Sequence, residues 1–189
     1  MTSTQLVRRA RIIEEVIDSI ADVGAEAVQM RDVAQRSGVA LATVYRYFSS
    51  KDHLLAAALE DWQKRLTRRI VAGAGPRDQD HLPAILEYLR RALRAFHRNP
   101  EMTALMFTMM TSADPAAQAT LDQMNRNNGD MFDRLLDGIP ADQIRNVSFG
   151  LNAALSSALT GMLTGRLTLD EALDLVAWTA RVLVTGATS

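Results

Sequence analysis

The order of apolar and polar residues along the chain predicts helices almost everywhere. Between Leu6 and Ile20, apolar residues recur at three- and four-residue spacing with charged residues between them, which is typical of an amphipathic helix. We find no run of alternating β-branched residues bounded by turn residues, so no strand is predicted. The pattern therefore predicts an all-α fold.

Glycine, proline and capping residues divide this pattern into nine predicted helices. Gly24 ends the first helix, and Asp114 before Pro115 supplies an N-cap carboxylate and a favourable first residue for the seventh. Thr168 and Glu171 have the spacing of a capping box at the start of the ninth. Gly73, Gly75 and Pro76 predict a loop after the fourth. The predicted helices span residues 6–23, 30–37, 41–47, 51–71, 82–98, 101–111, 115–137, 140–164 and 168–185.

The segment from Arg31 to Lys51 predicts two short helices joined by a tight turn. Ala34 is small and lets the second helix cross close to the first, while Gly38 suits the turn. The apolar seam consists of Val33, Val39, Val44 and Phe48. The remaining faces of the second helix are free to enter a DNA major groove. A helical hairpin without a DNA role has the same shape.

Particular residues of this segment resemble the DNA-binding domain of the TetR family over residues 8–55. The matching stretches are Asp32-Val-Ala34, Gly38-Val39, Thr43-Val-Tyr-Arg-Tyr-Phe48 and Lys51-x-x-Leu54-Leu55. The resemblance implies a nine-helix TetR-like fold, with a three-helix DNA-binding domain in residues 1–50 and a ligand-binding and dimerisation domain in residues 51–189. It also implies a homodimer that binds palindromic double-stranded operator DNA and responds to a small-molecule effector.

The resemblance also implies which side chains contact DNA. They are Gln29, Arg31, Leu41, Ala42, Thr43, Tyr45, Arg46, Tyr47 and Lys51. Gln29 and Ala40 stand where the family usually carries hydroxyl residues, so apolar contacts from Leu41 and Ala42 to thymine methyl groups are expected to contribute to readout. Arg46 is a candidate for a guanine or a phosphate. Further candidates for phosphate contacts, with a solvated charged face as the alternative, are Arg8, Arg9 and Arg11.

Charge and composition change this picture only a little. Residues 1–72 hold eleven Lys and Arg against nine Asp and Glu, a net of +2, and residues 73–189 hold ten against thirteen, a net of −3. The chain has no cysteine, and its three histidines lack metal-ligand spacing, so we expect no metal site, no cofactor and no enzyme activity. No signal peptide or membrane span is predicted, and a cytoplasmic location is expected.

The second half of the chain is rich in flexible apolar side chains. Six methionines lie within residues 102–131, and methionine adapts to irregular cavities, although plain core packing has the same composition. The predicted ligand pocket consists of Leu66, Leu89, Leu93, Phe96, Met102, Met106, Met109, Met110, Met124 and Phe132. The helix 82–98 also carries candidate partners for an anionic ligand group, with an exposed polar face as the favoured alternative; these are Arg90, Arg94, His97 and Arg98.

The stretches Val28-Gln-Met-Arg31 and Val39–Phe48 are similar to a steroid- and lipid-catabolism branch of the family. This similarity implies a bulky apolar or lipid-like effector, for which a steroid or an acyl-CoA thioester is an example. The expected function is a repressor that this effector releases from its operator, with activation as an alternative. A non-specific architectural DNA binder is disfavoured by the sequence pI of about 6.3.

The last two predicted helices are apolar on more than one face. One stripe is enough to bury a helix against its own subunit, so the excess predicts a partner copy, or else burial within one larger core. The predicted dimer interface consists of Leu151, Leu155, Ala158, Leu159, Met162, Leu173, Val176 and Ala180.

Overall fold

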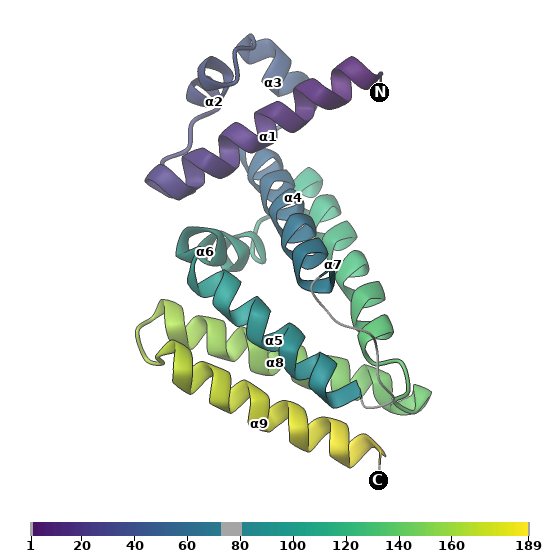
Figure 1. The fold of residues 1–189 in the computed structure, drawn as a ribbon. Coiled ribbons are helices and arrows are strands. Elements are labelled where there is room, and N and C mark those ends of the chain that lie inside the picture. The colour runs from purple at the N-terminus through teal and green to yellow at the C-terminus, as the bar shows by residue number, and fades with distance from the viewer. Residues whose placement is uncertain (1, 73–80, 189) are drawn as a thin grey trace. The chain divides into compact units, whose positions relative to one another are not determined.

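The computed structural model describes residues 2–72 and 81–188, and these residues form nine α-helices and no strand (Figure 1). The predicted all-α, nine-helix fold is confirmed. The predicted loop at Gly73, Gly75 and Pro76 lies outside the described residues. The helices are α1 Ser3–Val23, α2 Met30–Arg36, α3 Leu41–Tyr47, α4 Lys51–Ala72, α5 His81–His97, α6 Pro100–Met109, α7 Pro115–Leu135, α8 Ala141–Leu163 and α9 Leu169–Thr188.

Several helix boundaries are set by capping residues that can be recognised in the sequence. Gly24 has a φ of 78° and donates its amide to the Ile20 carbonyl, 2.9 Å away, which ends α1. The Asp114 carboxylate accepts from the Ala117 amide at 2.8 Å, as expected of an N-cap. Thr168 and Glu171 bond each other reciprocally, so both predicted capping features are confirmed.

The start of α1 differs from the sequence prediction. Thr2 caps the helix by accepting from the Gln5 amide, and the Gln5 side chain accepts from the Thr2 amide in return. This capping box begins α1 at Ser3, ahead of the first apolar residue, Leu6. Apolar spacing alone could not find that boundary, because the first turn is polar.

The chain forms two compact units. The first contains Met1–Arg65 and Glu101–Asn125, and the second contains Leu66–Pro100 and Arg126–Ser189. The boundaries therefore fall inside α4, after the first residue of α6, and inside α7. The predicted division at residue 50 separated the three N-terminal helices from the rest, whereas the compact first unit also contains the start of α4 and α6.

The first unit is held together by one apolar cluster. Its fully buried members include Ile12 on α1, Val44 on α3 and Leu54 on α4, each 0 % exposed. Met102 and Leu105 on α6 belong to the same cluster, at 2 % and 1 % exposed. The short helices α2 and α3 are thus fixed by packing, which is the main source of stability for helices of this length.

The second unit packs α5, α8 and α9 against one another. Leu89 and Leu93 on α5, Leu151 and Leu159 on α8, and Ala180 on α9 are all at most 1 % exposed. The turn between α8 and α9 folds tightly, because the backbone amides of residues 166 and 167 both donate to the carbonyl of residue 161. These contacts bring α9 back along α8.

Close approach at this turn makes Gly161 sensitive to substitution. A Cβ atom at Gly161 would lie 2.6 Å from Cδ1 and 2.8 Å from Cγ of Leu167, whereas a Cβ at Gly129 on α7 would have no atom within 4 Å. We expect Gly161→Ala to lower the free energy of unfolding by about 1–3 kcal/mol through overpacking. Gly129→Ala, the matched control, should raise it by about 0.5–1 kcal/mol through helix propensity. Urea unfolding measures both, and equal effects would contradict the packing argument.

Candidate functional site

The turn between α2 and α3 gives the two helices their angle. Gly38 has a φ of 65°, a left-handed conformation that suits glycine. Ser37 is 0 % exposed and its hydroxyl donates to the Val33 carbonyl at 2.6 Å. The buried hydroxyl is therefore satisfied within α2, and the chain turns directly into α3.

The inner face of α3 is the predicted apolar seam. Val44 and Phe48 are 0 % exposed and Val33 is 1 % exposed, while Val39 is half-buried and packs against the same cluster. The seam prediction is confirmed. Its burial fixes which side of α3 faces the protein and leaves the opposite side to solvent.

The outer face of α3 presents most of the predicted DNA-contact side chains. Leu41 and Tyr45 are 38 % and 51 % exposed, unusually high for large apolar residues on a packed helix. Ala42 and Arg46 are exposed and Thr43 is half-buried. These side chains share one accessible surface, which is the arrangement that a major-groove reader requires.

Neither α2 nor α3 has a side-chain cap. Gln29 and Ala40 occupy the N-cap positions, and neither side chain bonds to the helix that follows. The Gln29 and Arg31 side chains are exposed. The free amides at both helix starts are available to phosphate oxygens, which bind well at such positions.

Tyr47 differs from the other predicted contacts. Its hydroxyl oxygen is buried and has no hydrogen-bond partner among the described residues. Its ring packs against the apolar cluster, and the Arg46 guanidinium lies over the ring, 5.5 Å from its centroid. In this conformation the hydroxyl is not accessible to a DNA phosphate.

Lys51, at the first position of α4, already has a protein partner. Its ammonium donates to the Glu26 carbonyl at 2.6 Å. Glu26 lies in the connection between α1 and α2, so this bond ties the start of α4 to the approach of α2. An ammonium has three donors, so a phosphate contact remains available beside it.

Of the three N-terminal arginines, one is committed to the protein itself. The Arg9 guanidinium lies over the Phe48 ring, 5.1 Å from its centroid, a cation–π contact. Arg8 and Arg11 are exposed. The sequence could not separate these three, because the partner of Arg9 is distant along the chain.

Ion pairs that the sequence did not predict hold α1 to its neighbours. Arg36 on α2 lies 3.6 Å from Glu15 and 3.2 Å from Asp22 on α1, and Arg65 on α4 lies 3.2 Å from Glu14. These carboxylates therefore have structural partners. Exposed pairs of this kind contribute little stability each, but they orient the helices that carry them.

The predicted ligand-pocket residues are divided between the two units. In the first unit, Met102, Met109 and Met124 are buried in the apolar cluster, and Met106 packs against it. Met110 is 70 % exposed. In the second unit, Leu89, Leu93, Phe96 and Phe132 are buried and Leu66 is half-buried.

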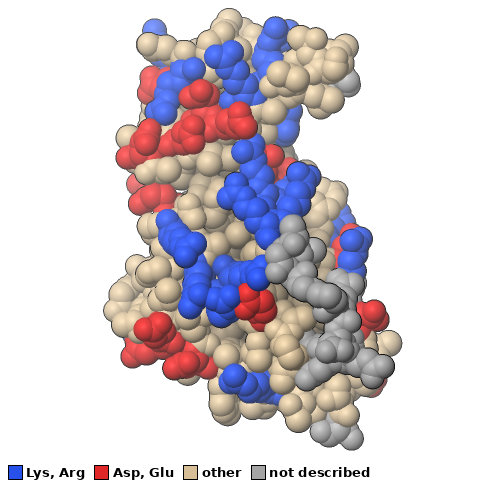
Figure 2. Space-filling view, viewed as in Figure 1, with Lys and Arg blue, Asp and Glu red and all other residues tan. Residues whose placement is uncertain are grey.

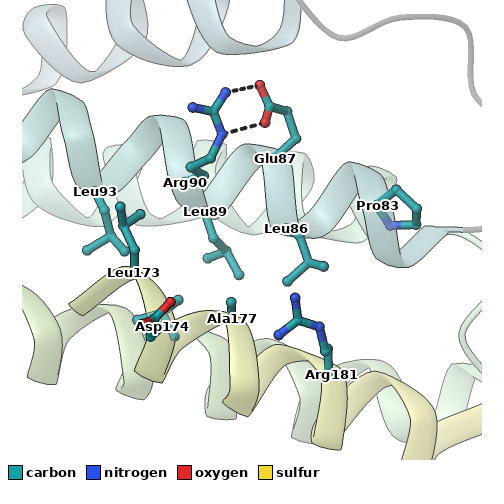
Figure 3. Close-up of a pocket in the computed structure, with 11 residues that line it drawn as sticks. Pro83, Leu86, Glu87, Leu89, Arg90, Leu93, Leu173, Asp174, Ala177 and Arg181 are labelled. Atoms are coloured by element: carbon teal, nitrogen blue, oxygen red, sulfur yellow. Dashed lines mark hydrogen bonds and ion pairs between the residues drawn. The ribbon is translucent and has the colours of Figure 1, made fainter. Parts of the chain in front are cut away.

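A groove of about 390 Å³ lies between α5 and α9 in the second unit (Figure 3). Leu86 and Leu89 of α5 point toward Ala177 of α9, and the Arg181 guanidinium reaches toward Leu86. Asp174 lies further along the same face of α9. The groove thus has an apolar floor with one cation and one anion from α9 at its edges.

Basic residues gather over α5 (Figure 2). Hydrogen bonds from Arg90 and then Arg91, which outweigh burial, lower the pKa of Glu87 to about 2. Its carboxylate therefore stays charged and occupies Arg90, which lies 2.6 Å from it. Among the predicted anion partners, Arg94 is half-buried and Arg98 is exposed, as is His97.

The predicted dimer residues on α8 and α9 lie mostly inside the subunit. Leu151, Ala158, Leu159, Val176 and Ala180 are at most 4 % exposed within the single chain, and Leu155, Met162 and Leu173 are half-buried. The exposed apolar residues on these helices are Phe149 at 78 %, Trp178 at 64 %, Leu175 at 53 %, Val182 at 50 % and Leu163 at 38 %. None of these five residues is among the predicted interface residues. The spacing at 175, 178 and 182 places three of them in one helical stripe.

None of the helices in residues 2–72 and 81–188 combines the length and the apolar content needed to cross a membrane. In the same residues, no three His, Asp or Glu side chains come together as a metal-ion site.

Comparison with protein families and characterised proteins finds matches along most of the chain. Residues 12–58 match the family described as bacterial regulatory proteins, tetR family, and residues 79–183 match the tetracyclin repressor-like C-terminal domain. The HTH-type transcriptional repressor KstR of Rhodococcus jostii is 38 % identical over 134 residues, covering 71 % of this chain and 60 % of that protein. KstR of Mycolicibacterium smegmatis is 36 % identical, covering 75 % and 69 %. The chain thus spans 60 % and 69 % of the length of these two relatives.

Solved structures share the fold over nearly the whole chain. A TetR transcriptional regulator from Rhodococcus sp. RHA1 superposes with a TM-score of 0.75 at 26 % identity, covering 97 % of this chain and 98 % of that one. The regulator FadR from Bacillus subtilis, solved in complex with stearoyl-CoA, has a TM-score of 0.72 at 14 % identity over 94 % and 98 % of the chains. At that identity the second likeness is one of fold alone.

The different surroundings of the two tyrosines on α3 predict different effects of removing each hydroxyl. Tyr47→Phe should leave DNA affinity unchanged and raise the free energy of unfolding by up to about 1 kcal/mol, because it removes a buried, unpaired hydroxyl. Tyr45→Phe removes an exposed hydroxyl and should weaken DNA binding about threefold or more without lowering stability. Fluorescence anisotropy with labelled duplex and thermal unfolding measure the two effects. A loss of affinity in Tyr47→Phe alone would show that its hydroxyl turns outward to reach DNA.

Proposed function

Because the chain belongs to the TetR family of bacterial regulatory proteins, we propose that it is a dimeric repressor released from operator DNA by a bulky apolar effector. As a member of this family it is a transcriptional regulator and not an enzyme, and its place of action is the cytoplasm, where the DNA is. The observation that carries the proposal is the exposed outer face of α3 around Tyr45 and Arg46, over a completely buried inner face.

In this proposal, α3 lies in the major groove and its outer side chains meet base edges. Leu41 and Ala42 suit thymine methyl groups, and Arg46 suits a guanine or a phosphate. Gln29, Arg31 and the free donors of Lys51 contact phosphates on either side. Backbone contacts of this kind fix the register of the helix, and base contacts supply the sequence preference.

A second copy of the chain covers the exposed apolar residues of α8 and α9. Phe149, Leu175, Trp178 and Val182 are each at least half exposed, and large apolar patches rimmed by polar residues mark interfaces. Two copies related by a twofold axis can place their α3 helices about 34–36 Å apart, one turn of DNA, which requires a palindromic operator.

The effector is a lipid-like molecule such as a steroid or an acyl-CoA thioester. Its proposal is supported by relatives named as KstR repressors and by the FadR structure that contains stearoyl-CoA. Within this chain, the α5–α9 groove offers an apolar floor, and its volume lies within the usual range for ligand sites, about 300–1,000 Å³. Arg181 at its edge suits an acidic group on the effector. The methionines around Met106 in the first unit are the second candidate location.

Release of DNA follows if the effector favours a state whose α3 helices have a different spacing. Affinity for DNA and for effector then fall by the same factor when both are present. α4 is one continuous helix that begins at Lys51 in the first unit and belongs to the second from Leu66 on. This helix is therefore a covalent route by which effector binding can reach the DNA-binding surface, and it is the one that begins beside α3 in the chain.

The experiment first selects a duplex from a random-sequence library with the purified protein and then adds stearoyl-CoA, stearate, a sterol ketone or coenzyme A. We expect a palindromic duplex, and at least about tenfold weaker binding with one of the apolar compounds but not with coenzyme A alone. Unchanged operator affinity with an apolar compound demonstrably bound would overturn release by such an effector. Failure to select any duplex would overturn operator binding itself.

A groove-filling variant tests where that effector binds. Ala177→Trp should fill the α5–α9 groove and abolish the effector response while leaving operator affinity intact, because Ala177 is half-buried and lies away from α3 in the chain. Ala141→Trp, at an exposed position at the start of α8, is the matched control. An unchanged response in Ala177→Trp would assign the effector to the methionine cluster.

The proposed dimer predicts a sharp effect of charge on the outer stripe of α9. Trp178→Glu should convert the dimer to monomer, because the exposed Trp178 is at the centre of the apolar stripe and a carboxylate there would be buried without a partner. Asp170→Arg changes charge at an exposed position in the first turn of the same helix, about two turns from Trp178, and should leave the dimer intact. Light scattering after size-exclusion chromatography measures the mass, and a dimer that survives Trp178→Glu would place the interface elsewhere.

A further inference from the structure

The side chain of His53 is part of the turn that joins α3 to α4. Its Nδ1 atom lies 3.2 Å from the Ser49 backbone nitrogen, which donates to it, and 3.2 Å from the Ser49 hydroxyl. The backbone amide of His53 in turn donates to the Ser50 hydroxyl at 2.9 Å. Ser50 and His53 thus have the spacing of a capping box, but the returning side chain is an imidazole and it accepts from the amide of Ser49, one residue before Ser50.

This geometry requires one protonation state of the ring. A backbone amide is always a donor, so Nδ1 must present a lone pair, and the proton of the neutral ring must be on Nε2. Protonation of Nδ1 would replace an acceptor with a donor facing another donor. The Ser49 amide would then lose its partner, and the turn would lose the bond that closes it.

The elements packed around the ring also disfavour the charged form. The His53 ring meets the edge of the buried Phe48 ring, with centroids 5.5 Å apart, and Arg9 of α1 lies over that same Phe48 ring. Burial and then Arg9 lower the pKa of His53 below its ordinary value of 6.5, and Asp114 opposes them. The carboxylate of Asp114 already accepts from Ala117 at the start of α7.

The charged neighbours of His53 on α4 itself are held by other partners. Lys51 donates to the Glu26 carbonyl, and the Asp52 carboxylate accepts from the Ser112 hydroxyl at 2.6 Å. An ammonium has no lone pair with which to accept from the Ser49 amide, and the Asp52 carboxylate is held at Ser112. The imidazole is therefore the group that closes this turn in the folded protein.

We propose that His53 is a positioning residue for operator binding: its unprotonated Nδ1 accepts from the Ser49 amide and sets the turn that orients α3. The inference rests on the operator binding proposed above. Phe48 ends α3 and Ser49 follows it directly, so the hydrogen bond acts one residue beyond the DNA-reading helix. Protonation of His53 releases Ser49 and loosens the angle between α3 and α4, and operator affinity falls.

The direction of the pH effect follows from the neutral ring in the native state. The folded protein binds the His53 proton less tightly than the unfolded chain does, so its contribution to stability is present above pH 6.5 and is lost as pH falls through the lowered value. Operator binding should weaken at and below the lowered value, because only there does His53 of the folded protein take up its proton and release the Ser49 amide.

The test compares wild type with His53→Asn and His53→Leu on the duplex selected by the wild-type protein. Asn places its amide oxygen where Nδ1 lies and does not titrate, whereas Leu keeps bulk and removes the acceptor. At pH about 7.5, Asn should bind like wild type and Leu about three- to tenfold more weakly, the range of one net hydrogen bond. As pH falls from about 7.5 through the lowered pKa of His53, wild type should weaken by up to a similar factor relative to its own affinity at neutral pH, and Asn should not.

His97→Asn is the matched control, because His97 is exposed on α5 and its replacement should leave the wild-type pH profile unchanged. Parallel pH profiles for wild type and His53→Asn would overturn the proposal, as would wild-type affinity in a folded His53→Leu. Nitrogen NMR of the histidine rings gives a readout that needs no DNA: Nδ1 of His53 should be unprotonated at neutral pH. A protonated Nδ1 would overturn the proposal, whereas failure of the wild type to select any duplex would count against operator binding alone.

Discussion

Burial of Val44 and Phe48 is the constraint on which the DNA-reading surface depends. α3 has seven residues, and Ala40 at its N-cap supplies no side-chain hydrogen bond. A helix this short is not stable in water by itself, so its packing against α2 and within the apolar cluster that it shares with α1 and α4 must supply its stability. The same packing decides that Tyr45 faces solvent. The orientation of the proposed DNA-contact surface thus depends on the apolar core of the first unit. A substitution in that core is expected to change how α3 is presented even where no DNA-contact residue is altered.

The polar contacts around this core are few, and they concentrate on the joints between helices. Lys51 bonds the connection before α2, Arg9 lies on the ring that ends α3, and His53 bonds the amide that follows it. Each uses a side chain from one element to hold the backbone or the ring of another. A connection between helices that is held by a single contact can change its angle when that contact is lost. The apolar core has many contacts and keeps its packing. This division suits the proposed regulator, in which each DNA-binding surface keeps its shape while the spacing of the two α3 helices changes.

The sequence predicted the helices and the exposed outer face of α3 well, because both depend on local information. The range Leu41–Tyr47 follows from the seam and from Gly38, whose positive φ the structure confirms. The burial of the Tyr47 hydroxyl could not be predicted, since it depends on how α3 packs against an apolar cluster whose members are far from it in the sequence. The three histidines lack metal-ligand spacing, and His53 was therefore given no role from the sequence. Ser50-x-x-His53 nevertheless has capping-box spacing. That signal was readable, but the box is usually recognised by its acidic or amide residue.

Hydrophobic periodicity could not show which apolar residues of α8 and α9 are exposed, for a different physical reason. Both helices carry two apolar stripes, and a hydrophobic pattern gives the width of the apolar surface without saying which stripe meets the subunit's own core. Val176 and Ala180 face inward, and Leu175 and Trp178, one and two positions away from them, face outward. A helix that turns about 100° per residue makes those near-neighbours point to different partners. The excess of apolar surface predicts a second partner, but only the fold of the subunit could show which of the two stripes is left exposed for it.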